Sequence, residues 1–167
     1  PMHILHSKAA DVPKEYRAAA SAILCARLAH NSKLAANVPL IHRVLGVTKS
    51  APGPHCHKSR RPIERRELDE YHCAVGVLDG GIVVAAAAYR HVKGPRRAAD
   101  NGLDFTELLL LAVDASHERR GFAKAMVRHI EREGARARSA RLVVVSNGHA
   151  FWLQPQLRLE PSPLSSL

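Results

Sequence analysis

Residues 105–133 read FTELLLLAVDASHERRGFAKAMVRHIERE, and the interpretation of the whole chain starts from this stretch. Phe105–Val113 is an apolar run of strand length, which is typical of a strand in the middle of a sheet. A polar turn follows, and Phe122–Glu133 then repeats apolar residues at helical spacing. The stretch therefore predicts a strand, a turn and a helix that starts at Gly121.

The predicted helix has an apolar and a basic face. Phe122, Met126 and Ile130 form the apolar stripe, joined by Ala123 and Val127, which predicts packing against the sheet. Gly134 stands where a C-terminal cap is expected, so we expect the helix to end there. The basic face carries Lys124, Arg128 and Arg132.

The turn Arg119–Ala123 has the features of a phosphate-binding helix start. Backbone N–H groups in the first turn of a helix lack intrahelical acceptors, and the helix dipole adds partial positive charge there. Gly121 permits close approach of a ligand, Ala123 keeps the next turn small, and Arg119 and Arg120 add formal charge. The pattern alone fits both a phosphate site and an ordinary helix start with surface arginines.

Upstream of this stretch, the sequence predicts a β-hairpin. Residues 71–78 (YHCAVGVL) and 82–90 (IVVAAAAYR) are apolar runs of strand length, and Asp79-Gly80-Gly81 between them is a hairpin signal. Downstream, residues 141–146 (RLVVVS) predict another strand. Helices are predicted over residues 14–30 and 33–45, although Pro39 argues against an unbroken second helix.

The other segments are predicted to be loops within one domain that spans residues 1–167. Residues 47–70 and 91–104 combine Pro, Gly and charged residues, which indicates surface loops, the first of them mobile. The His-Cys-His cluster at residues 55–57 is too compact to supply a complete metal site, so no metal is expected. Residues 160–167 are predicted to be a frayed tail.

Composition narrows the class of partner. The net charge of +10 favours an anionic partner such as nucleic acid, a membrane surface or a phosphate-rich cofactor. The 4% aromatic content leaves little for base stacking and no apolar run is long enough for a bilayer, so neither direct nucleic-acid binding nor a membrane partner is expected. Three cysteines and the lack of a signal-like segment predict an intracellular protein of the cytoplasm or nucleus.

From Tyr71 to about Arg158 the chain resembles the Gcn5-related N-acetyltransferase (GNAT) superfamily in its order of hairpin, strand, phosphate turn, helix and strand. The superfamily's pyrophosphate loop follows the pattern Gln/Arg-x-x-Gly-x-Gly/Ala, and here Glu118, Gly121 and Ala123 occupy those positions. Glu118 departs from the pattern at its first place. The resemblance implies an α/β (α+β) fold with a mixed, mostly antiparallel central sheet flanked by helices.

The resemblance is strongest to the histone acetyltransferase branch. That branch begins the same strand with Phe-x-Glu and ends it with Ala-Val or Ala-Ile, as Phe105-Thr106-Glu107 and Ala112-Val113 do here. The resemblance implies that acetyl-CoA is the cofactor, that the end of this strand pairs with its pantetheine arm and that the turn holds its pyrophosphate. The implied cofactor-binding residues are Leu111, Ala112, Val113, Glu118, Arg119, Arg120, Gly121, Phe122, Ala123, Phe151 and Trp152.

Glu107 is the candidate catalytic residue. A lysine amine has a reference pKa of about 10.4, so a general base must remove its proton before it attacks a thioester. Glu107 alternates with Phe105, Leu109 and Leu111, so we expect apolar surroundings that raise its pKa. Alternation alone also fits a Glu107 that faces solvent, and the resemblance implies the catalytic role.

The sequence therefore predicts an acetyl-CoA-dependent N-acetyltransferase that acts on a primary amine, with a histone-type protein lysine as the expected acceptor. A small-molecule amine is the alternative acceptor. A non-catalytic CoA-binding or interaction module is a second alternative, because Glu118 departs from the loop pattern and Leu157-Arg158-Leu159 replaces the family's usual Gly-Phe ending.

Overall fold

The computed structural model describes residues 1–8, 11–28, 41, 45, 71–93 and 104–144. The strands within these residues are β1 (Met2–Lys8), β2 (His72–Leu78), β3 (Val83–Val92), β4 (Phe105–Val113) and β5 (Arg141–Val144). The helices are α1 (Lys14–Leu28) and α4 (Phe122–Arg136), and a short 3-10 turn, η1 (Ala115–His117), precedes α4.

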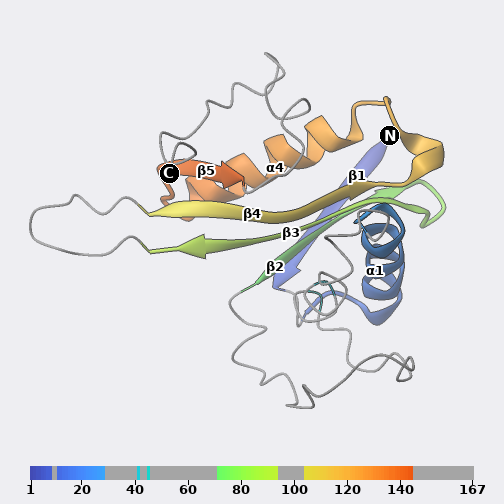
Figure 1. The fold of residues 1–167 in the computed structure, drawn as a ribbon, viewed down its shortest axis with the longest axis horizontal. Helices are drawn as coiled ribbons and strands as arrows, with labels where there is room; N and C mark the ends of the chain where they lie inside the picture. Colours follow the sequence, from blue (N-terminus) through green and yellow to red (C-terminus); the bar gives the residue numbers. More distant parts are fainter. Residues whose placement is uncertain (9–10, 29–40, 42–44, 46–70, 94–103, 145–167) are drawn as a thin grey trace, which may run out of the picture.

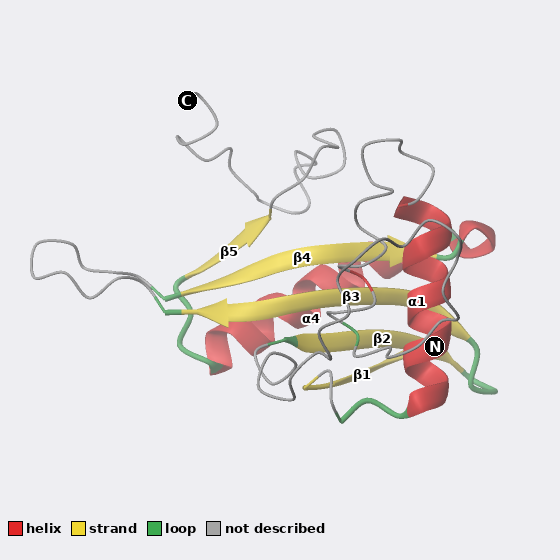
Figure 2. Ribbon diagram, turned by 60° about the horizontal axis from the view of Figure 1, so that its bottom comes forward, coloured by secondary structure: helices red, strands yellow, loops and turns green. Residues whose placement is uncertain are grey.

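The five strands form one sheet in the order β1-β2-β3-β4-β5. Neighbouring strands are antiparallel from β1 to β4, whereas β5 runs parallel to β4. Parallel neighbours need a crossover, and α4 provides it between β4 and β5. Figures 1 and 2 show α1 on one face of the sheet and α4 on the other, so the predicted mixed, mostly antiparallel sheet flanked by helices is confirmed.

The core consists of two apolar layers, one on each face of the sheet. The α1 layer joins residues such as Ala20 and Leu24 to Val75, and the α4 layer joins residues such as Met126 and Ile130 to Leu108. Ala85–Ala88 of β3 are fully buried and alternate between the two layers. Their small side chains let both helices pack close to the centre of the sheet.

The predicted hairpin is confirmed, with strand ends shifted by one or two residues. Gly80 and Gly81 have φ of 85° and 80°, the left-handed region that glycine adopts without strain, in a three-residue loop between Leu78 and Ile82. Leu78 closes the turn, because its N–H donates to the carbonyl of Ile82 at 2.9 Å. The predicted strand Phe105–Val113 matches β4.

Two features of the fold differ from the sequence prediction. The sequence does not predict β1, which forms an edge strand that pairs along its whole length with β2. The prediction that α4 ends at Gly134 is wrong, because the helix continues to Arg136. Gly134 instead lies against β4: a Cβ added there would come within 2.7 Å of Oγ1 of Thr106. The glycine marks close packing of a helix on a sheet.

Several predicted segments lie outside the described residues. Of the predicted helix 33–45, Ile41 and Leu45 are described; both are buried in the α1 layer, and Leu45 donates to the carbonyl of Ile41 at 3.0 Å. Phe151, Trp152, the loop 47–70, most of the loop 91–104 and the tail 160–167 are not described. None of the described helices is both long and apolar enough to cross a bilayer.

Candidate functional site

The turn between β4 and α4 contains two residues in the left-handed region. Asp114 caps η1, since its carboxylate accepts a hydrogen bond from the backbone N–H of Ser116 at 3.1 Å. Arg119 has φ of 59°, and Gly121, the N-cap of α4, has φ of 81°. A non-glycine residue in this region is strained by roughly 1–2 kcal/mol. Such strain is concentrated at ligand-binding turns, which supports the predicted role of this one.

The start of α4 presents a row of backbone N–H groups that meet no backbone acceptor in the part of the chain that the structure describes. Among the described residues, Arg119–Lys124 donate no backbone hydrogen bond, and Ala125 is the first to do so, to the carbonyl of Gly121 at 3.0 Å. Apart from the two chain neighbours of Gly121 and the backbone of α4, no heavy atom of a described residue lies within 4 Å of where a Cβ on Gly121 would stand. Unpaired N–H groups and the positive end of the helix dipole together suit an anion such as phosphate.

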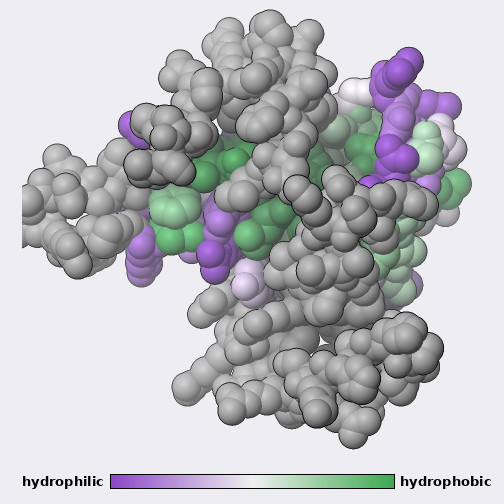
Figure 3. Space-filling model, in the orientation of Figure 1, coloured by the Kyte–Doolittle hydropathy of each residue, from purple (hydrophilic) through white to green (hydrophobic). Residues whose placement is uncertain are grey.

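Positive charge surrounds this turn. Arg119 and Arg120 are exposed and form no ion pair with a described residue. Glu118, the acidic departure from the loop pattern, is paired with Arg27 of α1. Figure 3 shows hydrophilic side chains gathered at this end of the molecule, at the upper right. The negative charge of Glu118 is therefore offset by Arg27, which lies far from it in the sequence.

A β-bulge divides β4 into two halves. Leu108 pairs with Tyr89 and Leu110 pairs with Ala88, so Leu109 is an extra residue without a partner on β3. An extra residue reverses the alternation of the side chains that follow it. Accordingly, Leu108 belongs to the α4 layer and Leu110 to the α1 layer.

The bulge corrects one prediction about the strand. Leu111 and Val113 pack toward the α4 layer, and Ala112 is buried in the α1 layer. Glu107 lies between Thr106, which contacts α4, and Leu108 of the α4 layer, so Glu107 faces the α1 side. The expectation that Glu107 and Leu111 share a face is wrong, because period-two alternation does not anticipate a bulge.

The surroundings of Glu107 also differ from the prediction. Its side chain is 16% exposed, and its Oε2 accepts a hydrogen bond from Nε of Arg90, its cross-strand partner, at 2.6 Å. The expected apolar environment is therefore wrong, since a guanidinium lies against the carboxylate. The other oxygen, Oε1, accepts no hydrogen bond from a described residue. The carboxylate is held in one orientation with one oxygen able to accept a proton.

The second half of β4 has an edge that no described strand covers. β5 pairs with Phe105–Leu108 and, in the described residues, not with Leu109–Val113. Figure 2 shows β5 turning away from β4 as the two strands advance. Backbone groups along Leu109–Val113 are therefore placed to bind an extended ligand in the manner of an added strand.

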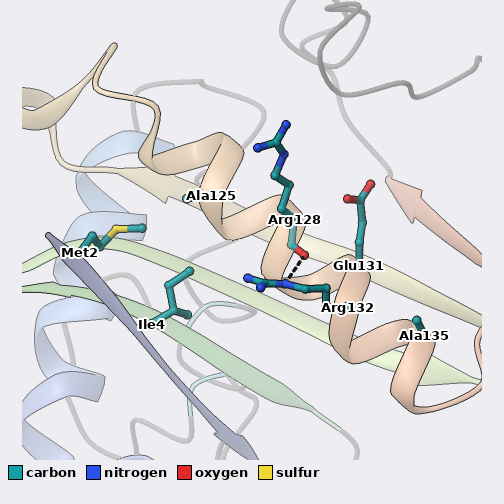
Figure 4. Close-up of a pocket in the computed structure, with 7 residues that line it drawn as sticks. All are labelled: Met2, Ile4, Ala125, Arg128, Glu131, Arg132 and Ala135. Carbon is teal, nitrogen blue, oxygen red and sulfur yellow. Dashed lines mark hydrogen bonds between the residues drawn. The ribbon is translucent and has the colours of Figure 1, made fainter.

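The remaining predicted residues lie beside the turn, except for two that the structure does not describe. Phe122 and Ala123 are partly buried, and the ring of Phe122 lies 6.3 Å from the ring of His117. Phe151 and Trp152 are outside the described residues. An open groove of about 680 Å³ lies elsewhere, between β1 and α4, and includes neither Glu107 nor the turn (Figure 4). Its lining residues are Met2, Ile4, Ala125, Arg128, Glu131, Arg132 and Ala135.

Sequence reasoning missed a group of histidines beneath the C-terminal half of α4. His72 stacks on Tyr89 at 5.2 Å between ring centroids and meets His91 at 4.9 Å. Burial, reinforced by His91, His6 and Lys8 against the opposing effect of Glu133, lowers the pKa of His72 to about 4. Burial also lowers the pKa of His129.

One sequence feature could have pointed to these histidines. His129 and Glu133 are four residues apart in a predicted helix, and that spacing places two side chains on the same face.

Hydrogen bonds hold Asp114 as a carboxylate at the other end of α4. The hydroxyl of Ser116 and the ring of His117 lower the pKa of Asp114 below its usual value by hydrogen bonding to its side chain. His117 reaches Oδ2 of Asp114 through Nδ1 at 3.1 Å. This network fixes the path of the chain from β4 into the turn.

Three solved structures illustrate the similarity in fold. A GCN5-related N-acetyltransferase from Ralstonia eutropha JMP134 is 19% identical, with 98% of this chain and 95% of that chain covered and a TM-score of 0.63. An aminoglycoside N-acetyltransferase, AAC(6')-Iy, solved with CoA, is 13% identical, with 97% and 90% covered and a TM-score of 0.61. A ribosomal-protein-alanine N-acetyltransferase from Brucella melitensis biovar Abortus 2308 is 14% identical, with 96% and 93% covered and a TM-score of 0.62.

A search of curated protein sequences finds no significant match. A sequence model described as "Acetyltransferase (GNAT) family" matches residues 41–152, about two thirds of the 167-residue chain. That range contains β2 to β5, the turn and α4. The chain therefore belongs to the acetyltransferase (GNAT) family and is an N-acetyltransferase that uses acetyl-CoA.

Proposed function

We propose that this protein transfers the acetyl group of acetyl-CoA to the amine of a protein lysine, with Glu107 as the general base. The observation that carries the proposal is that one strand, β4, bears both a partly buried carboxylate and the phosphate-type turn at its end. Val113 lies six positions after Glu107, which is about 20 Å along the strand at ~3.3 Å per residue. A pantetheine arm laid along β4 from the turn would extend toward Glu107.

The cofactor-binding part of the proposal rests on backbone groups. The N–H groups of Arg119–Ala123 would hold the pyrophosphate, since they lack other acceptors among the described residues. The edge of Leu111–Val113, which no described strand covers, would pair with the amides of the pantetheine arm. Glu118 fits this arrangement because Arg27 offsets its charge.

The catalytic part follows from the geometry of Glu107. Oε1 would accept the proton of the acceptor amine, while Arg90 keeps the carboxylate oriented through Oε2. The neutral amine nitrogen would then form a bond to the acetyl carbonyl carbon, and the C–S bond would break with its electrons on sulfur. The nitrogen would release its surplus proton to solvent, and the thiolate would take up a proton from solvent. Backbone N–H groups of Leu111–Val113 would stabilise the negative charge on the carbonyl oxygen.

The acceptor is the least constrained part of the proposal. The sequence resemblance of Phe105-Thr106-Glu107 favours a protein lysine of the histone type. The named neighbours favour a second candidate, because two act on other amines: one is an aminoglycoside acetyltransferase and another a ribosomal-protein-alanine acetyltransferase. A small-molecule amine is therefore the alternative acceptor.

Replacement of Glu107 by Gln tests the proposal. The amide is nearly isosteric but cannot take up a proton, so turnover should fall by roughly 10²–10⁴-fold with little change in acetyl-CoA affinity. Glu131→Gln on the exposed side of α4 is the matched control and should keep the wild-type rate. Rates should be compared on a lysine peptide, a peptide with a free N-terminal alanine and an aminoglycoside. Wild-type turnover by Glu107→Gln on the preferred acceptor would remove Glu107 from the mechanism.

A further inference from the structure

Three side chains with metal-binding atoms meet where β1 crosses α4. His6 comes from β1, and His129 and Glu133 lie one turn apart on α4. One ligand-type atom from each residue lies within 4.8 Å of those of the other two. The group is separate from Glu107 and from the turn at the start of α4, so the acetyl transfer does not use it.

The distance between the ligand atoms of His6 and Glu133 suits a tetrahedral zinc ion. Zinc binds His nitrogen and carboxylate oxygen at about 2.0–2.2 Å, which places neighbouring ligand atoms of a tetrahedron about 3.4 Å apart. Nε2 of His6 is 3.2 Å from Oε2 of Glu133. The other carboxylate oxygen, Oε1, is held by Arg136. One oxygen of Glu133 is thus oriented toward the histidines by a second residue, as metal-binding carboxylates commonly are.

A second observation concerns the ring nitrogen Nε2 of His129. Its Nε2 is buried and makes no hydrogen bond to any described residue. The ring lies 5.0 Å from the ring of His6 between centroids, and one nitrogen of each ring lies within 4.8 Å of the other. A buried nitrogen without a partner is costly unless something occupies the position opposite it.

We propose that His6, His129 and Glu133 form a zinc site that fastens β1 to α4. Three protein ligands leave a fourth position for water, and His6, with 34% of its side chain exposed, sets that position at the surface. Among the described strands, β1 lies at the edge of the sheet and pairs with β2 alone. Zinc would add a second attachment between β1 and the rest of the fold, so its expected role is structural.

The test uses the whole chain, prepared without a polyhistidine tag and freed of metal by dialysis against a chelator. Calorimetry at neutral pH should show one zinc ion bound per chain, and zinc should raise the midpoint of thermal unfolding. Cobalt, used as a spectroscopic substitute, should develop visible absorption that zinc abolishes. His6→Ala should weaken zinc binding at least about tenfold, since even residues that only support a ligand contribute 10–100-fold.

Further variants test each proposed ligand in turn. Glu133→Gln and His129→Ala should weaken zinc binding as His6→Ala does; His6 is the safest to replace, because it is exposed. His3→Ala on the same strand is the matched control and should bind zinc as the wild type does. The proposal is overturned if wild-type protein binds no zinc when the zinc concentration is about 100 micromolar, which would detect even a weak site. It is also overturned if His6→Ala binds zinc with the affinity of the wild type. It is also overturned if replacing residues 55–57 abolishes binding.

Discussion

The two halves of α4 have surroundings that come from different parts of the sequence. At the N-terminal end, Arg119 and Gly121 take left-handed conformations, and the backbone N–H groups of residues 119–124 meet no backbone acceptor within the described part of the chain. These features lie within a few residues of one another in the sequence. In the C-terminal half, His129, Glu133 and Gly134 acquire their surroundings from β1 and β4. A residue's chemistry can therefore be read from its neighbours at a turn, but on a packed helix face it depends on which strands lie beneath.

Of all the substitutions, Gly121→Glu should have the largest effect. It should weaken acetyl-CoA binding at the N-terminal half of α4 and leave the C-terminal half unchanged. The new side chain would occupy the open space at the turn, and its charge would repel a phosphate. We expect acetyl-CoA to bind about 100-fold more weakly or not at all, which is ~2.7 kcal/mol or more. Calorimetry measures the affinity, and the zinc affinity should stay unchanged.

Gly81→Glu is the matched control for that variant. Gly81 has nearly the same φ, 80°, and equally open space around its missing Cβ, but it lies in the β2–β3 hairpin. It carries the same strain and the same added charge. If both variants weaken acetyl-CoA binding equally, a general effect of charge accounts for the loss and the turn has no special role.

Gly134→Ala should disturb the second half of α4 and leave cofactor binding alone. The added Cβ would lie 2.7 Å from Oγ1 of Thr106, a fully buried residue. Crowding costs roughly 1–3 kcal/mol, and alanine returns about 1 kcal/mol of helix propensity, so a net loss of up to about 2 kcal/mol is expected. Chemical denaturation gives this value. In a Thr106→Ala background the penalty should shrink, and an undiminished penalty would show that the contact is not its cause.

The pH dependence of the free energy of unfolding should reveal the buried histidines beneath the C-terminal half of α4. The pKa of His72 is lowered to about 4 by burial, then by His91, His6 and Lys8, with Glu133 opposing. The unfolded chain, with an ordinary histidine pKa of about 6.5, binds protons first as pH falls. Stability is therefore fully present above pH 6.5 and is lost as pH falls toward 4. Since the ring is only half buried, we expect a loss of about 1–2 kcal/mol.

Denaturation of His72→Asn across the same pH range checks this assignment. The variant lacks the titrating ring, so its stability should fall less between pH 6.5 and 4 than that of the wild type. Parallel curves for the two proteins would assign the acid sensitivity to another group.

Arg27→Ala should have the smallest effect. Arg27 and Glu118 are both partly exposed, and such ion pairs contribute about 0–1 kcal/mol. Without Arg27, the charge of Glu118 is no longer balanced beside the turn, so acetyl-CoA affinity should fall a few-fold. Adding Glu118→Gln should restore it. If affinity is unchanged in Arg27→Ala, the pair has no part in cofactor binding.

Much of the fold was predictable from the sequence because its signals are local. The apolar run Phe105–Val113, the Asp79-Gly80-Gly81 turn and the glycine at the start of α4 each determine structure within a few residues. The bulge at Leu109 was not predictable, because it depends on the register between β3 and β4. It reverses the faces of β4 from Leu110 onward, and so Leu111 lies on the face opposite to Glu107. The neighbour of Glu107 on β3, Arg90, also depends on that register.

The second half of α4 illustrates the same limit. His129 and Glu133 are one helical turn apart, which the sequence displays, but their third partner, His6, lies on an edge strand with little sequence signal. In the sequence Gly134 resembles a cap, because glycine commonly ends helices. Only the packing of α4 on Thr106 reveals why it lies inside one.

The central claim is that the turn at the start of α4 binds the phosphates of acetyl-CoA. Calorimetry of acetyl-CoA against acetyl-pantetheine, which has the same reactive end but no phosphate, tests it most directly. Wild-type protein should bind acetyl-CoA at least about 100-fold more tightly, a difference of ~2.7 kcal/mol, and Gly121→Glu should abolish that difference. Equal binding of the two compounds by the wild type, or a difference that survives in Gly121→Glu, would contradict the claim.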